Sequence, residues 1–147
     1  MLRHRSGTSY EDMYWLDISS AQIVASEISQ QSPSKIQYSK STRHAIRNHK
    51  NLLAIHTHPS SMPPSVGDFN SALRNNYRVC IVCCHNGKLF MYRSHKYIIE
   101  FFYKSTIAKY KHRGYNDYEA QIKTLIEFEE HKYITFKEVN ADEITRK

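Results

Sequence analysis

The sequence predicts an α/β (α+β) fold in which a mixed central β-sheet is flanked by helices. Three observations predict it. Strand-like and helix-like runs alternate in the first half of the chain, in the order strand, strand, helix, strand. Residues 79–84 form a continuous apolar run, which is typical of a strand buried on both faces. Asn86-Gly87 follows shortly after, and this dipeptide strongly favours a β-hairpin.

Hydrophobic period and turn residues predict the other elements in order. Residues 13–18 and 22–26 form a hairpin across a turn at 19–21. Strands are also expected at residues 35–38, 52–58, 88–92 and 133–136, and helices at 39–48, from Ser65 onward, at 96–113 and from the cap Asn116 to 131. The chain therefore divides into a flexible N-terminal arm (1–9), a core (10–93) and a C-terminal helical extension with a final strand (94–147).

Composition limits the class of protein. The 147 residues suit one domain, and a mean hydropathy of -0.64 without any apolar run of about 18 residues excludes a membrane span. The N-terminus is basic and then polar, unlike a secretory signal. Cys80, Cys83 and Cys84 are an odd number, which favours a reducing compartment, so a cytoplasmic protein is expected. The net charge of +7 permits nucleic acid as a partner but does not indicate it.

The strongest chemical signal comes from His56 and His58, at the end of the predicted strand 52–58. Histidines at i and i+2 on a strand project from the same face, so the two can bind one ion together. Pro59 cannot continue a central strand, which places both histidines at its C-terminal end. Asp68 follows ten residues after His58. Imidazole nitrogen and carboxylate oxygen are ligands that zinc favours, and a catalytic zinc site keeps its fourth position for water.

Ser65 and Asp68 also have the spacing of a helix capping box, with Ser65 as N-cap and Asp68 at N3. The capping role and the metal role are compatible. A helix that begins at Ser65 holds Asp68 in its first turn, close to the histidines when the connecting loop folds back over the end of the strand.

The pattern His56-x-His58-Pro59, then Ser65-x-x-Asp68, resembles the signature of the JAMM (MPN+) metalloproteases and their RadC-type bacterial relatives. That family places one residue more between the second histidine and the serine than this chain does. The resemblance implies a cytidine-deaminase-like JAMM fold and one zinc ion (Zn2+) per chain, held by His56, His58 and Asp68. It also implies that Ser65 helps to stabilise the oxyanion.

The resemblance further implies an upstream glutamate as general base. In the RadC-type branch this glutamate lies at the start of a strand that ends in a Leu-Asp pair, and Leu16-Asp17 matches that description. Glu11 is therefore the expected base. Asp12 and Glu27 remain alternatives, and Glu27, at the end of the second strand, is the stronger of the two.

On this resemblance we expect a JAMM-type zinc metallopeptidase or isopeptidase. It would cleave peptide or isopeptide (amide) bonds of a protein or peptide substrate, with zinc-bound water as nucleophile. The tight Asn86-Gly87 turn leaves no room for an insertion that ubiquitin-cleaving members carry there, so the chain is similar to minimal bacterial or phage-type members. Two alternatives stay open: a catalytically inactive JAMM-like binding or scaffold domain, and a RadC-like nucleic-acid-associated protein. No membrane partner is expected, and the sequence leaves the oligomeric state open.

Overall fold

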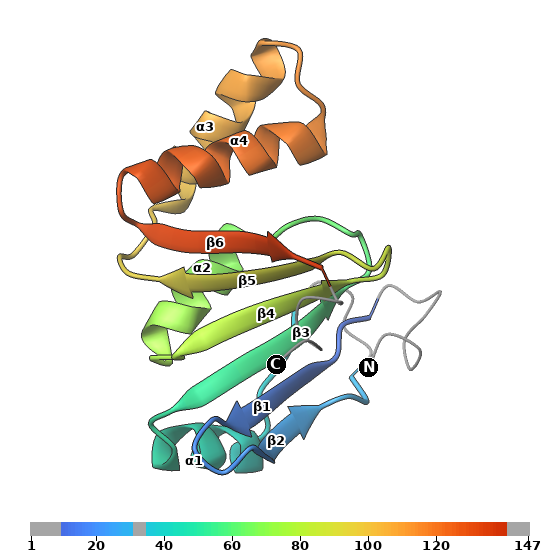
Figure 1. Cartoon of the computed structure of the whole chain (residues 1–147), viewed down its shortest axis with the longest axis vertical. Coiled ribbons are helices and arrows are strands. Elements are labelled where there is room, and N and C mark those ends of the chain that lie inside the picture. Colours follow the sequence, from blue (N-terminus) through green and yellow to red (C-terminus); the bar gives the residue numbers. More distant parts are fainter. Residues whose placement is uncertain (1–9, 31–34, 141–147) are drawn as a thin grey trace.

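In the described part of the chain, six strands form one mixed sheet in the order β2-β1-β3-β4-β5-β6, accompanied by four helices (Figure 1). The computed structural model describes residues 10–30 and 35–140. The elements in chain order are β1 Met13–Asp17, β2 Gln22–Glu27, α1 Lys40–Asn48, β3 Leu52–His58, α2 Val66–Arg74, β4 Val79–Cys84, β5 Leu89–Ser94, α3 Glu100–His112, α4 Asp117–Glu130 and β6 Ile134–Val139. The α/β class predicted from the sequence is confirmed. The predicted N-terminal arm, residues 1–9, lies outside the described residues.

The sheet topology brings three segments of the chain to one edge. β3 is parallel to β4, and β1 is antiparallel to β3 with Met13 opposite His56. The C-terminal ends of β3 and β4 therefore lie beside the residues that lead into β1. The pairing continues beyond β1, because the Thr57 N–H donates to the Asp12 carbonyl oxygen at 3.0 Å. Continuing the register by one more residue places Glu11 opposite His58.

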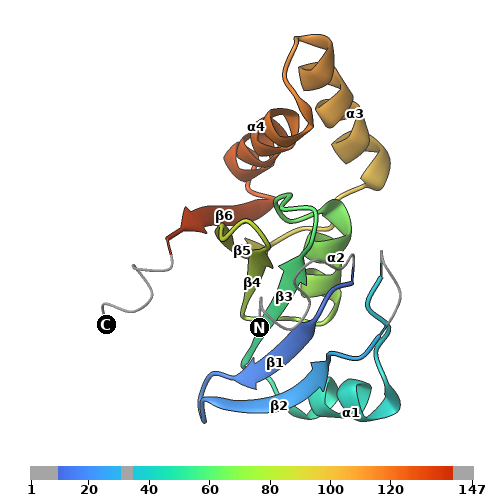
Figure 2. The same ribbon diagram turned by 90° about the vertical axis from the view of Figure 1, so that its right-hand side faces the viewer.

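Helices α1 and α2 cover the same face of the sheet (Figure 2), and the main core lies beneath them. Trp15, Phe69 and Phe90 are fully buried. The Trp15 indole Nε1 donates to the Tyr77 hydroxyl at 2.8 Å, so its polar atom is satisfied inside an apolar environment. Phe69 belongs to α2, so this packing holds α2, and the first turn that carries Asp68, against the sheet.

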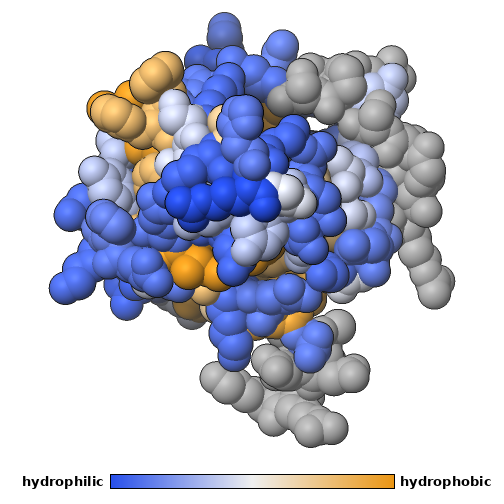
Figure 3. Space-filling view, turned by 90° about the horizontal axis from the view of Figure 1, so that it is seen from above, coloured by the Kyte–Doolittle hydropathy of each residue, from blue (hydrophilic) through white to orange (hydrophobic). Residues whose placement is uncertain are grey.

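The C-terminal segment extends the same sheet. β6 is antiparallel to β5, and α3 and α4 pack against each other beside β6 (Figure 1). Glu129 of α4 accepts a hydrogen bond from the Phe136 N–H of β6 at 3.0 Å. Seen from this end, the surface is mostly hydrophilic with separate hydrophobic patches (Figure 3), and Phe101 and Phe102 of α3 are among the exposed apolar side chains. Within residues 10–30 and 35–140, every helix is too short or too polar to cross a membrane.

The hairpins and the central elements agree with the sequence prediction to within a few residues. Gly87 has a φ of 92°, as a tight Asn-Gly turn requires. Residues 35–38, in contrast, do not form the expected strand. The reason is visible at Gln37, whose N–H donates to the Gln30 side-chain Oε1 at 2.6 Å instead of to a neighbouring strand.

Two further expectations need correction. α3 begins at Glu100 rather than at residue 96, because the Ile98 N–H is taken by Asn70 Oδ1 at 2.9 Å, which holds this stretch in a non-helical conformation. Residues 79–84 are not equally buried on both faces. Fully buried and half-buried side chains alternate along β4, as expected when α1 and α2 cover only one face of the sheet.

Candidate metal centre

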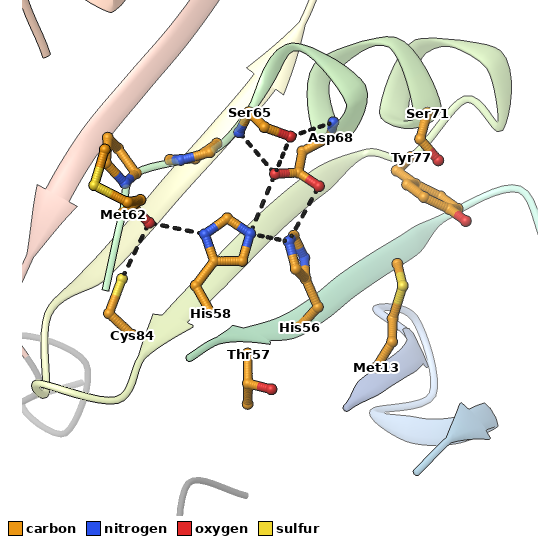
Figure 4. Close-up of polar contacts among 12 residues, drawn as sticks. Met13, His56, Thr57, His58, Met62, Ser65, Asp68, Ser71, Tyr77 and Cys84 are labelled. Carbon is orange, nitrogen blue, oxygen red and sulfur yellow. Dashed lines mark hydrogen bonds and ion pairs between the residues drawn. The ribbon is translucent and has the colours of Figure 1, made fainter. Parts of the chain in front are cut away.

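His56 and His58 lie on one face of β3, at its C-terminal end (Figure 4). The two residues are 3% and 7% exposed, and their ring centroids are 4.8 Å apart. Thr57 lies between them and points to the opposite face, where its Oγ1 accepts a hydrogen bond from the Asp12 N–H at 2.9 Å. The strand alternation predicted for the two histidines is therefore confirmed.

Asp68 reaches both histidines from the first turn of α2. Its Oδ1 lies 3.3 Å from His56 Nε2, and its Oδ2 lies 3.3 Å from His58 Nε2. The two Nε2 atoms are 3.0 Å apart. The short connection between β3 and α2 is therefore long enough for the carboxylate to meet both rings. Asp68 is also the only acidic residue in the sequence between Glu27 and Glu100.

The spacing of these three groups fits a tetrahedral metal ion. Zinc binds imidazole nitrogen and carboxylate oxygen at about 2.0–2.2 Å, so neighbouring ligand atoms around it are about 3.3–3.5 Å apart. The separations here are 3.0 and 3.3 Å, and one ligand atom from each residue lies within 4.8 Å of the others. His56, His58 and Asp68 could therefore bind a metal ion with small adjustments of their side chains.

A backbone contact orients one of the two rings. His58 Nδ1 donates to the Met62 carbonyl oxygen at 2.8 Å, which directs Nε2 toward Asp68 (Figure 4). Metal-binding histidines commonly donate their second ring N–H in this way. His56 Nδ1 is buried and has no hydrogen-bond partner among the described residues. The His56 ring is therefore held by packing and by the contacts of its Nε2 atom.

The cluster is electrostatically coupled. Burial lowers the pKa of His58, but the hydrogen bond and the charge of Asp68, together with the Met62 carbonyl, outweigh burial and raise the pKa to about 9. Burial raises the pKa of Asp68, but the charges and hydrogen bonds of His56 and His58 outweigh it and hold the pKa well below its ordinary value. Asp68 is thus ionised at neutral pH, which is the state required of a metal ligand.

Ser65 forms the capping box that the sequence predicts. Its Oγ accepts from the Asp68 N–H at 3.3 Å, and its own N–H donates to Asp68 Oδ2 at 2.7 Å. The Ser65 Oγ also donates to Asp68 Oδ2 at 2.9 Å. The contacts that begin α2 therefore also fix the direction of the Asp68 carboxylate toward the histidines.

Glu11 is half-buried and lies beside the cluster. Burial raises the pKa of Glu11, the charges of His56 and His58 oppose this rise, and Asp68 adds to it, with a net increase above the ordinary value. All three cluster residues are therefore within electrostatic range of the Glu11 carboxyl group. A carboxyl group of raised pKa beside a candidate metal site has the properties of a general base.

The two alternative bases are placed differently. The Asp12 backbone pairs with β3, and the alternation of side chains directs its carboxylate away from the face that holds the histidines. Glu27 accepts hydrogen bonds from the Ser39 N–H at 2.7 Å and from the Thr42 hydroxyl at 2.6 Å, at the start of α1. Glu27 is therefore engaged in holding α1, and Glu11 is the glutamate that the fold brings beside the histidines.

Sequence reasoning missed two sets of contacts at this site. The Met62 carbonyl oxygen is a backbone acceptor, which any residue type supplies and no side-chain pattern marks. Gln121 of α4 donates through Nε2 to the carbonyl oxygens of Pro63 and Pro64, at 3.2 and 3.1 Å. This contact joins residues distant in the sequence, and only the fold brings them together.

The comparisons with known proteins found no match: no protein-family model, no curated protein and no solved structure matches this chain. The fold and the site together define an α/β protein with a six-stranded mixed sheet. At one edge of that sheet, His56, His58 and Asp68 form a cluster that could bind a metal ion.

Proposed function

We propose that the chain is a zinc-dependent metallohydrolase of the JAMM type that cleaves peptide or isopeptide bonds. The observation that carries the proposal is the convergence of His56, His58 and Asp68 at separations near those of tetrahedral ligands. Two nitrogens and one carboxylate oxygen form a ligand set typical of hydrolytic zinc sites, in which the fourth position is left for water. The motif described above, His-x-His-Pro followed by Ser-x-x-Asp, supports the same class and a cytidine-deaminase-like JAMM fold.

Glu11 is the proposed general base. When bound, a zinc ion would supply a Lewis acid and lower the pKa of a water molecule toward about 7. Glu11 would accept a proton from the attacking water and deliver it to the leaving amine, a role worth typically about 10²- to 10⁴-fold in rate. The raised pKa of Glu11 supports this role, because it brings the carboxyl group closer to neutral pH.

Ser65 is the proposed donor to the oxygen of the scissile carbonyl group. Its hydroxyl, which is bonded to Asp68 Oδ2 in this structure, would turn to that oxygen as negative charge develops on it. The Ser65 N–H would keep its 2.7 Å bond to Asp68 Oδ2. The position of the carboxylate therefore does not depend on the hydroxyl.

An assay with two substrate types tests the proposal. Zinc-loaded protein is incubated with fluorogenic linear peptides and with peptides joined through a lysine side-chain amide. We expect cleavage of at least one type, its loss when a chelator removes zinc, and its return when zinc is restored. A protein that binds zinc and cleaves neither type would instead be a metal-binding scaffold, and the proposed activity would be rejected.

A further inference from the structure

The loop between β3 and α2, residues 59–64, determines where Asp68 lies. It contains Pro59, Pro63 and Pro64, which have no backbone N–H to donate. Pro63 and Pro64 are buried, so their carbonyl oxygens need donors from elsewhere in the protein. The carbonyl of Pro64 directly precedes Ser65, the residue that begins α2.

The donors come from the C-terminal helices. Gln121 Nε2, on α4, donates to the Pro63 and Pro64 carbonyl oxygens at 3.2 and 3.1 Å. The hydroxyl of Tyr103, on α3, lies 3.4 Å from the same Pro64 oxygen, and Tyr103 is only 2% exposed. Both helices of the C-terminal pair thus contact the last two carbonyl groups of the loop, immediately before the helix turn that carries Asp68.

A second connection lies on the other side of Asp68. Asn70, two residues further along α2, donates through Nδ2 to the Ile98 carbonyl oxygen at 2.8 Å, and its Oδ1 accepts from the Ile98 N–H at 2.9 Å. Ile98 is fully buried and directly precedes the N-cap of α3. The C-terminal segment therefore holds the chain both before and after Asp68.

We propose that Gln121 is a positioning residue of the metal centre, and that α3 and α4 hold the 59–64 loop so that Asp68 meets His56 and His58. Gln121 touches none of the three ligands; it acts through the carbonyl groups that precede Ser65. This inference rests on the proposed function in one respect, namely that the cluster binds zinc.

The test uses the full chain and two isosteric variants. Gln121→Met keeps the length of the side chain and removes both hydrogen bonds to the loop. The matched control is Thr124→Val, which removes a buried hydrogen bond inside α4, from Thr124 Oγ1 to the Ala120 carbonyl at 2.8 Å, and leaves the loop contacts intact. Circular dichroism verifies that each variant is folded.

Two readouts are measured: zinc affinity, by competition with a chromophoric chelator, and amide hydrogen exchange of residues 60–66 in the metal-free protein. We expect Gln121→Met to weaken zinc binding about tenfold, as is typical when a partner of a metal ligand is removed, and to accelerate exchange in the loop. Thr124→Val should match the wild type in both readouts. Unchanged zinc affinity in a folded Gln121→Met variant would overturn the proposal, even with faster exchange.

The two readouts also separate this proposal from the proposed function. If the wild type binds no zinc at all, the metallohydrolase proposal fails. The exchange comparison then still decides whether Gln121 holds the loop, and equal exchange in the wild type and Gln121→Met would overturn that part as well.

Discussion

The Nε2 atoms of His56 and His58 lie 3.0 Å apart, on the side of β3 that faces the first turn of α2. Two imidazole nitrogens at this separation repel each other through their lone pairs unless a proton or a cation lies between them. The Asp68 carboxylate completes the group, with one oxygen 3.3 Å from each ring. The arrangement thus favours a bound positive charge, and the predictions below follow from it.

The first prediction concerns metal content. His58→Ala should lose the metal, because Asp68 and a single imidazole cannot replace the missing ligand. The measurement is zinc per chain by elemental analysis, after purification without chelators or a nickel column. His44→Ala is the matched control, since His44 is exposed on α1 and bonds only to the Asn48 side chain at 2.8 Å among the contacts described. Zinc retained at wild-type content in His58→Ala would argue against this ligand set.

The second prediction separates the base from the ligands. Glu11→Gln should keep zinc and lose turnover by about 10²- to 10⁴-fold, because the amide cannot accept the proton. Zinc content and kcat are measured on the same preparation. Glu27→Gln is the control, because Glu27 is also a half-buried glutamate but is bonded to α1. Wild-type kcat in Glu11→Gln would reject the assignment of the base.

The third prediction concerns stability and pH at Glu27. Partial burial acts to raise the pKa of Glu27, but hydrogen bonds from Thr42, Ser39 and Gln30 outweigh it and lower the pKa. A lowered pKa in the folded state gives a stability contribution that is present above the ordinary pKa of 4.5 and is lost as pH falls through the folded value. Glu27→Gln should therefore cost roughly 1 kcal/mol in the free energy of unfolding at neutral pH.

Urea unfolding of the wild type and Glu27→Gln at neutral pH and in acid measures this effect. The difference in free energy of unfolding between the two proteins should shrink in acid, where Glu27 itself is protonated. A difference that stays constant across this range would show that the charge of Glu27 does not hold α1.

The fourth prediction divides the two roles of Ser65. Ser65→Ala removes a helix cap, which costs about 1 kcal/mol in stability, and also the proposed donor to the oxyanion, which costs about 10²- to 10³-fold in kcat. Ser39→Ala removes the cap of α1, where Ser39 Oγ accepts from the Thr42 N–H at 3.2 Å. Ser39→Ala should lose stability to a similar extent and keep its kcat. A similar loss of kcat in both variants would assign the effect of Ser65 to folding alone.

Local spacing was sufficient to predict the centre of this site. The i, i+2 histidines at a strand end and the Ser65–Asp68 capping box are short-range patterns, and the structure confirms both. Glu11 was identified through a family resemblance, because nothing in its own neighbourhood marks it. Its proximity to the histidines follows from the β1–β3 pairing, a long-range feature of the fold.

The failures have a common physical cause. Residues 35–38 are β-capable by composition, yet side chains bond their backbone, so local propensity was overridden. The expected start of a helix at residue 96 failed for the same reason, because Asn70 takes the Ile98 N–H. The contacts of Gln121 with the loop could not be predicted, since a single glutamine in a helix carries no signal of a distant partner.

Diffraction data collected at the zinc absorption edge, from crystals grown with zinc, test the central claim most directly. The account predicts one anomalous peak per chain, at about 2.0–2.2 Å from the nitrogen and oxygen ligands of His56, His58 and Asp68, with Glu11 beside it. A map with no peak at this position, and with Asp68 turned away from the two rings, would contradict it.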